Sequence, residues 1–112
     1  MTSYAALSGG FGEGIGSPRE LLEACLATIA VREPVVRAFT HLAPEAARAA
    51  ADAAGARWRA GTPLSAIDGM PIALKDILET ADMPTGFGSP IFAGKNGGRD
   101  SAVAYALRRA GA

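Results

Sequence analysis

The chain has 112 residues, with 11 basic and 11 acidic side chains and a formal net charge of zero. This length suits one small domain, and the balanced charge gives no electrostatic basis for binding nucleic acid or an anionic membrane surface. The single cysteine, Cys25, excludes an internal disulfide, and no stretch approaches the roughly 20 apolar residues that span a bilayer. We therefore expect a cytoplasmic protein without a membrane segment or a nucleic-acid partner.

The composition predicts a thin core. Apolar residues make up 49% of the chain, which is ordinary for a globular domain and excludes intrinsic disorder. Much of this share is alanine, which buries little surface per residue. A core built from it should be smaller than the percentage suggests.

A flexible lead-in and then a helix are predicted at the start of the chain. Residues 1–16 are rich in glycine, so we expect a domain that occupies residues 17–112. Ser17 precedes a proline and lies three residues before Glu20, which is the pattern of a capped helix start. The helix should end near Arg32, because a proline follows two residues later. Its apolar face would consist of Leu21, Leu22, Cys25, Leu26 and Ile29.

Two further helices follow from similar signals. One should begin at Pro44 and stop at Gly61, and small side chains on one of its faces would permit close packing. The other should be capped by Asp100 and end at Gly111. The close-packing face of the first consists of Ala47, Ala50, Ala51, Ala54 and Trp58.

Two strands are predicted between these helices. Residues 35–42 are rich in β-branched and aromatic side chains, and residues 70–78 form a nearly continuous apolar run. The resulting order of helices and strands predicts an α/β fold. A run like 70–78 is typical of a strand that is covered on both faces and has sheet neighbours. Only one other strand is evident, so the sheet is expected to be incomplete.

Lys75 ends the apolar stretch with which residues 70–78 begin, and it is the main candidate for chemistry. In one interpretation its ammonium reaches solvent or pairs with Asp76, whose role would be to orient the strand end. In the other, the lysine is partly desolvated, which lowers its pKa and lets it act as a base near neutral pH. The ends of strands in open α/β sheets are common places for sites.

The remaining polar and reactive residues favour ordinary structural roles. His41 has no partner in the sequence pattern, Cys25 lies on an apolar helix face, and Trp58 is expected in the core. No cluster has the spacing of metal ligands, and no glycine-rich loop opens a helix in phosphate-binding form. We expect neither a metal nor another cofactor.

A set of ordered landmarks in residues 63–112 resembles the amidase signature family. They run from a Pro-Leu through an apolar segment into Lys-Asp, and on to a helix that ends in Ala-Gly-Ala. Residues 17–42 also resemble the N-terminal helix and first strand of that family. The landmarks are Pro63-Leu64, Gly69-Met70-Pro71, Lys75-Asp76, Pro84-Thr85, Gly88-Ser89, Asp100 and Ala110-Gly111-Ala112.

The resemblance implies a fold, a reaction and a role for one residue. The fold would be the N-terminal part of a mixed sheet covered by helices, and the reaction would be hydrolysis of a small-molecule carboxylic amide. The family uses a serine nucleophile, a second serine in a cis peptide, and a lysine base that matches Lys75. Ser89 lies in a segment that resembles a loop near the family's active site, which makes it a candidate for contacting substrate.

The family's nucleophile motif is missing from these residues, since no Gly-Gly-Ser-Ser occurs in the 112 positions. The expectation is an N-terminal fragment that carries the catalytic Lys75 alone and is inactive by itself. The alternative is an inert truncated remnant, or a split-gene product that binds a companion chain. An unpaired strand edge would also allow self-association.

Overall fold

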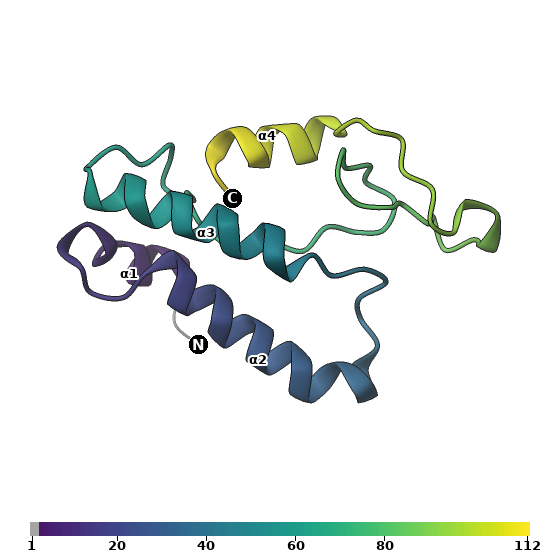
Figure 1. Ribbon diagram of the computed structural model, residues 1–112, viewed down its shortest axis with the longest axis horizontal. Helices are drawn as coiled ribbons and strands as arrows, with labels where there is room; N and C mark the ends of the chain where they lie inside the picture. The colour runs from purple at the N-terminus through teal and green to yellow at the C-terminus, as the bar shows by residue number, and fades with distance from the viewer. Residues whose placement is uncertain (1–2) are drawn as a thin grey trace.

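The structure, a computed structural model, describes residues 3–112. Helices α2 and α3 lie side by side, and α4 lies above α3 in the view of Figure 1. Long irregular segments join α3 to α4 and extend to the right of that view. In chain order the elements are α1 (Tyr4–Ser8), the 3-10 helix η1 (Phe11–Glu13), α2 (Pro18–Val36), α3 (Pro44–Arg59), the 3-10 helix η2 (Pro90–Phe92) and α4 (Ala102–Ala110).

Four predicted helix boundaries are confirmed, and one of them is the start of α3 at Pro44. The Ser17 hydroxyl caps α2 by accepting the backbone N–H of Glu20 at 3.1 Å. Gly61 follows the end of α3 with a φ of 71°, and Gly111 follows α4 with a φ of 92°. Glycine adopts such positive φ values without the clash that a Cβ would cause.

The predicted cap of α4 was wrong by one residue. Ser101 caps the helix, because its hydroxyl accepts the N–H of Ala104 at 3.3 Å. Asp100 instead accepts the N–H of Ala81 at 2.8 Å and forms an ion pair with Arg108 at 2.9 Å. The Arg108 guanidinium lowers the pKa of this carboxyl group. Asp100 therefore fastens α4 to the preceding loop.

The predicted strand at residues 35–42 does not form. Helix α2 was expected to end near Arg32 but continues through Pro34 to Val36. A proline lacks only its own N–H, so near a helix end it leaves a single carbonyl without its partner. The backbone and side chain of Glu33 then close the helix, since they accept the N–H groups of Arg37 at 2.9 Å and Phe39 at 2.8 Å.

The predicted strand at residues 70–78 does not form either, and residues 3–112 contain no β-strand. The segment runs irregularly to Lys75 and then turns, because the Lys75 carbonyl accepts the N–H groups of Ile77 at 2.7 Å and Leu78 at 2.9 Å. A strand exists only where a neighbour pairs with its backbone groups. The described part of the chain supplies no such neighbour, so the α/β sheet expected from the sequence is absent here.

The lead-in before Ser17 was expected to be flexible, but its described part is folded against α3. Phe11 in η1 is only 4% exposed. Its ring contacts the rings of Tyr4 and Trp58 edge-on, with centroids 6.1 and 6.0 Å away. Edge-to-face packing of this kind is favourable beyond the area it buries. Three aromatic side chains thus join α1, η1 and α3.

The core is thin, as the composition predicts. Its centre is the contact between α2 and α3, and its buried side chains include Leu22 of α2 and the completely buried Ala54 of α3. Gly69 lies directly against this centre, since a Cβ there would come within 2.9 Å of Ala54 Cβ and 2.7 Å of Pro18 Cβ. Many large apolar side chains remain exposed: Ile15, Val31, Val35, Val36, Leu64, Ile72, Ile77, Ile91, Val103 and Tyr105 are among them.

A buried carboxylate links these helices to the loop that follows α3. Asp68 is 0% exposed, and both of its carboxylate oxygens accept hydrogen bonds from Arg57, at 2.8 and 2.6 Å. The Leu64 N–H donates a third bond at 2.9 Å. The backbone carbonyl of Asp68 accepts the Trp58 indole N–H at 2.8 Å and the Tyr4 hydroxyl. One residue thereby holds α1, α3 and the 60–69 loop together.

The pKa values around Asp68 reflect this burial. Burial raises the pKa of Asp68, but the hydrogen bonds from Arg57 and Leu64 outweigh it, and the net shift is downward. Burial, with the Asp68 charge second, raises the pKa of Tyr4 to about 12. Asp68 is therefore ionised and Tyr4 neutral throughout the physiological range.

The end of α4 docks on the same loop. The Gly69 N–H donates to the Gly111 carbonyl at 2.8 Å, and the Ser65 hydroxyl donates to the Ala110 carbonyl at 2.7 Å. A Cβ on Gly111 would lie 2.2 Å from Asp68 Oδ1. Gly111 is thus required both for its positive φ and for the room it leaves to the carboxylate.

Two glycine substitutions separate these requirements. Gly61→Ala places a Cβ at a φ of 71° in open space, so it should lower the free energy of unfolding by only about 1 kcal/mol. Gly111→Ala adds the collision with the Asp68 carboxylate, so it should cost at least about 2 kcal/mol more. Urea unfolding followed by circular dichroism measures both. Equal losses would show that the Asp68 carboxylate does not limit the space at Gly111.

Candidate functional site

Lys75, the main candidate from the sequence, lies at the surface. Its carbonyl starts the turn described above, and its side chain is exposed. Among residues 3–112 no acidic side chain forms an ion pair with its ammonium. Of the two outcomes that the first interpretation left open, the ammonium therefore reaches solvent and does not pair with Asp76. Partial desolvation of Lys75 is not seen either, because the strand that would have buried it does not form.

Asp76 instead binds a loop that is ten residues further along the chain. Its Oδ1 accepts the N–H of Gly86 at 2.8 Å, and its backbone carbonyl accepts the N–H of Phe87 at 3.0 Å. A Cβ on Gly86 would lie 2.9 Å from Asp76 Oδ2, so a larger residue at position 86 would displace the carboxylate. Phe87 takes a φ of 52°, which large side chains rarely adopt. The two bonds hold this loop beside the turn at Lys75.

A hollow of about 390 Å³ opens between this loop and the segment before α3. Three residues that the sequence analysis discussed line this hollow: His41, Asp76 and Ser89. The Ser89 hydroxyl accepts the N–H of Ile91 at 3.4 Å, at the start of η2. The lining residues are Thr40, His41, Asp76, Pro84, Gly86, Gly88, Ser89, Pro90, Ala93 and Gly94.

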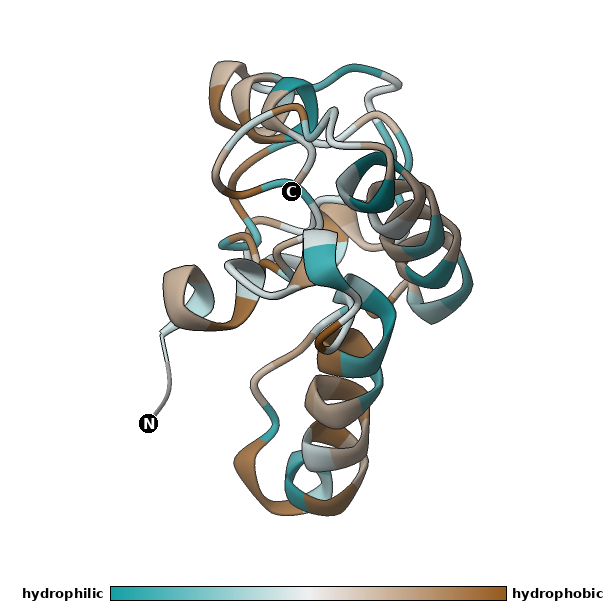
Figure 2. Cartoon of the chain, turned by 90° about the vertical axis from the view of Figure 1, so that its left-hand side faces the viewer, coloured by the Kyte–Doolittle hydropathy of each residue, from teal (hydrophilic) through white to brown (hydrophobic). Residues whose placement is uncertain are grey.

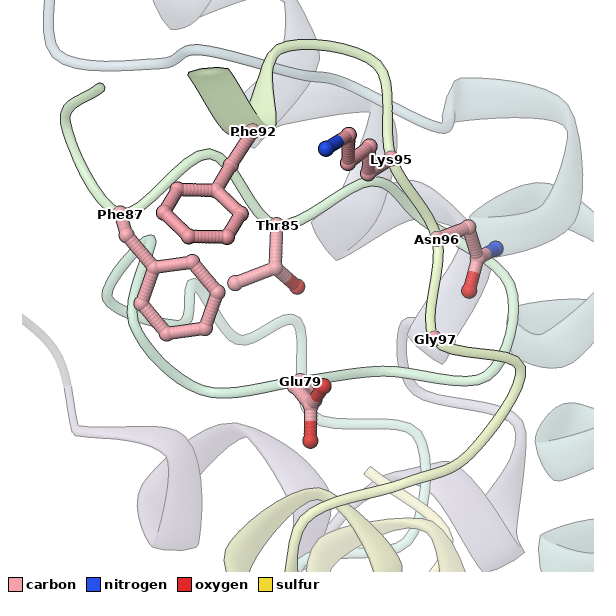
Figure 3. A pocket seen from close by; sticks show the side chains of 7 residues that line it. All are labelled: Glu79, Thr85, Phe87, Phe92, Lys95, Asn96 and Gly97. Atoms are coloured by element: carbon pink, nitrogen blue, oxygen red, sulfur yellow. The ribbon is translucent and has the colours of Figure 1, made fainter. Parts of the chain in front are cut away.

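A second hollow of about 550 Å³ lies beside the first and was not predicted from the sequence (Figure 3). The rings of Phe87 and Phe92 form one side of it, with centroids 5.3 Å apart. Lys95 Nζ lies 5.5 Å from the centre of the Phe92 ring, and Glu79 lies below the two rings. The signal for this hollow was a pair of phenylalanines five residues apart in a glycine-rich loop.

The other sequence candidates have structural surroundings. Trp58 donates its indole N–H to Asp68 and packs on Phe11, so it belongs to the core cluster. Cys25 is half-buried on α2, and His41 is exposed. Residues 3–112 contain no group of three or more His, Cys, Asp or Glu side chains arranged to hold a metal ion. No helix in this range is long and apolar enough to cross a membrane.

Comparison with known proteins identifies the family of the chain. The family described as Amidase matches residues 20–112. A glutamyl-tRNA(Gln) amidotransferase subunit of Chloroflexus aggregans is 57% identical over 75 residues, which are 67% of this chain and 15% of that protein. The protein of the same name from Salinispora arenicola is 41% identical over 109 residues, or 97% of this chain and 22% of that one. The chain thus spans less than a quarter of these relatives.

Solved structures agree with the sequence comparison. The peptide amidase PAM, in complex with the competitive inhibitor chymostatin, superposes with a TM-score of 0.90 at 31% identity, over 99% of this chain and 23% of that one. A vestigial protein complex that reveals the origins of an s-triazine catabolic enzyme superposes with a TM-score of 0.88 at 31% identity, over 98% of this chain and 24% of that one. The resemblance noted from the landmarks in residues 63–112 is confirmed, and the chain belongs to the amidase family.

Proposed function

We propose that the chain supplies the lysine base of an amidase that hydrolyses carboxylic amides, and that this base is Lys75. The observation that supports the proposal most strongly is the state of the two neighbours in the Lys-Asp pair. The Lys75 ammonium is free of ion pairs among residues 3–112, while the Asp76 carboxylate accepts the Gly86 N–H. A base needs such freedom, because a bound carboxylate would favour its protonated form.

The proposed reaction needs Lys75 in its neutral form. The neutral amine accepts a proton, through a second serine, from the serine that attacks the amide carbonyl. The acyl-enzyme forms as ammonia or an amine leaves, and water then hydrolyses the ester. Backbone N–H groups near the nucleophile would stabilise the oxyanion, and such groups supply a large part of the rate. The 112 residues contain no Gly-Gly-Ser-Ser motif. Of the three catalytic groups, these residues would therefore contribute the lysine alone.

The same proposal accounts for the exposed Lys75 and the missing sheet. Residues 17–112 would form the N-terminal portion of an amidase domain whose mixed sheet is completed by strands outside residues 3–112. Residues 70–75 would then pair as a strand, since their backbone finds no ladder partner here. Pairing would bury the end of this segment and desolvate Lys75, which lowers its pKa toward neutrality. Ser89, on the hollow next to Asp76, is proposed as a contact for the amide substrate.

A second candidate function is that of a component that binds a companion chain. The end of α2 favours it, because Val31 and Val35 are 79% and 87% exposed there. In Figure 2 the lower end of the chain, where α2 ends, carries hydrophobic segments in brown between hydrophilic ones in teal. The amidotransferase relatives are themselves named as subunits. An exposed apolar patch of this kind is typical of an interaction surface.

The role of Lys75 can be tested in a protein that holds all three catalytic groups. Residues 1–112 replace the matching part of the Salinispora relative, which is 41% identical over 109 residues, and hydrolysis of a simple primary amide is measured. Lys75→Ala should lower the rate by about 10²–10⁴-fold. Lys75→Arg should lower the rate almost as much, because a guanidinium cannot accept a proton. The 112-residue chain alone should hydrolyse no amide.

The second lysine provides the matched control. Lys95→Arg retains the positive charge at the only other lysine of the chain and should leave the rate within about two-fold. If Lys75→Arg kept most of the parent rate, Lys75 would serve as a charge that positions another group, and the base assignment would be wrong.

The exposed end of α2 predicts that the chain associates when it is alone. Sedimentation velocity over rising concentrations should show species larger than the monomer. Val35→Lys should shift the distribution toward the monomer without loss of stability, since this side chain is 87% exposed and packs on little. A parent chain that stays monomeric at every concentration would argue against an interaction surface at this end.

A further inference from the structure

The carboxylate nearest to Lys75 in the sequence is held by the 84–89 loop. We infer that Asp76 is a positioning residue: its bond to the Gly86 N–H keeps the carboxylate away from Lys75 and so leaves the lysine without its nearest counter-ion. This inference rests on the proposed role of Lys75 as a base. It assigns a function to a residue that does not itself react.

Two backbone contacts carry the inference. The Gly86 N–H donates to Asp76 Oδ1 at 2.8 Å, and the Phe87 N–H donates to the Asp76 carbonyl at 3.0 Å. The side chain and the backbone of Asp76 thus bind successive residues of one loop. Their combined geometry fixes the direction of the carboxylate, which a single contact to a flexible side chain would not do.

The sequence of the loop is adapted to this contact. Any residue other than glycine at position 86 would place its Cβ 2.9 Å from Asp76 Oδ2. Phe87 holds a positive φ of 52°, although no glycine stands there. An unfavourable backbone conformation persists where surrounding contacts determine it, and the Phe87 N–H is held by Asp76. The loop therefore accepts strain at one residue while it binds Asp76.

Release of the carboxylate would change the chemistry of Lys75. The two residues are adjacent, and an opposite charge within about 6 Å favours the protonated form of a lysine. In the observed arrangement Asp76 makes no ion pair with Lys75, and its charge is partly satisfied by the loop. Freed from the loop, the carboxylate can approach the ammonium and reduce the fraction of neutral amine.

The test uses the 112-residue chain and measures how fast acetic anhydride acetylates Lys75. Peptide mass spectrometry follows the reaction, and added Nα-acetyl-lysine amide serves as the internal reference for the rate. Gly86→Ala should release the carboxylate and slow acetylation of Lys75 about two-fold or more. Asp76→Ala should not slow it, and the double variant should return to the parent rate because no carboxylate is left. Gly9→Ala is the control, since its Cβ would meet nothing closer than 3.7 Å.

Amide hydrogen exchange gives an independent second readout. Asp76→Ala should speed exchange of the Gly86 N–H about ten-fold, whereas Asp76→Asn should retain most of its protection because the amide oxygen still accepts the bond. Protection of the α2 and α3 amides shows that each variant is folded. If Gly86→Ala unfolds the chain, the comparison of Asp76→Asn with Asp76→Ala still tests whether the side chain of residue 76 holds the Gly86 N–H.

Three results would overturn the inference: an unchanged acetylation rate in Gly86→Ala, slowing that persists in the double variant, or equal Gly86 protection in Asp76→Asn and Asp76→Ala. Neither readout requires turnover. A failure here therefore leaves the base assignment of Lys75 to its own kinetic test, and a failure of that test does not affect these measurements.

Discussion

A carboxylate removed from water must be paired, because an isolated buried charge costs many kcal/mol. Asp68 meets this condition with two bonds from Arg57 and one from the Leu64 N–H. These bonds fix the course of the 60–69 loop, and the loop in turn receives the end of α4 through Gly69 and Gly111.

This constraint extends to the candidate site. Gly69 follows Asp68 and packs closely against Pro18 and Ala54. From there the chain runs to the turn at Lys75. Only a short segment separates the fixed point from the lysine, so the position of Lys75 depends on both ends of that segment. Asp68 determines one end, and the hydrogen bonds of Asp76 to the 84–89 loop determine the other. The folded state of residues 3–112 thus presents the lysine even without a sheet.

The sequence predicted what depends on local chemistry and failed where distant partners decide. The Ser17 cap and the glycines at 61 and 111 act within one turn of helix, so their effect could be read directly. The strand at 70–78 could not, because its formation requires neighbours that these residues lack. The family resemblance singled out Lys75 and Ser89 as candidates, but it said nothing of the buried Asp68, whose partner Arg57 lies 11 residues earlier, on α3.

The most direct test of this account compares two aspartates that both pair with arginine. The Asp68 side chain is buried and pairs with Arg57, whereas the Asp52 side chain pairs with Arg19 at the surface. Asp68→Asn should lower the free energy of unfolding by about 3 kcal/mol and Asp52→Asn by less than about 1 kcal/mol, measured in urea by the fluorescence of Trp58. Because the folded pKa of Asp68 is lowered, its contribution should be present above about pH 4 and fall as the pH drops through that lowered value. Equal small losses in the two variants would contradict a structure that depends on Asp68.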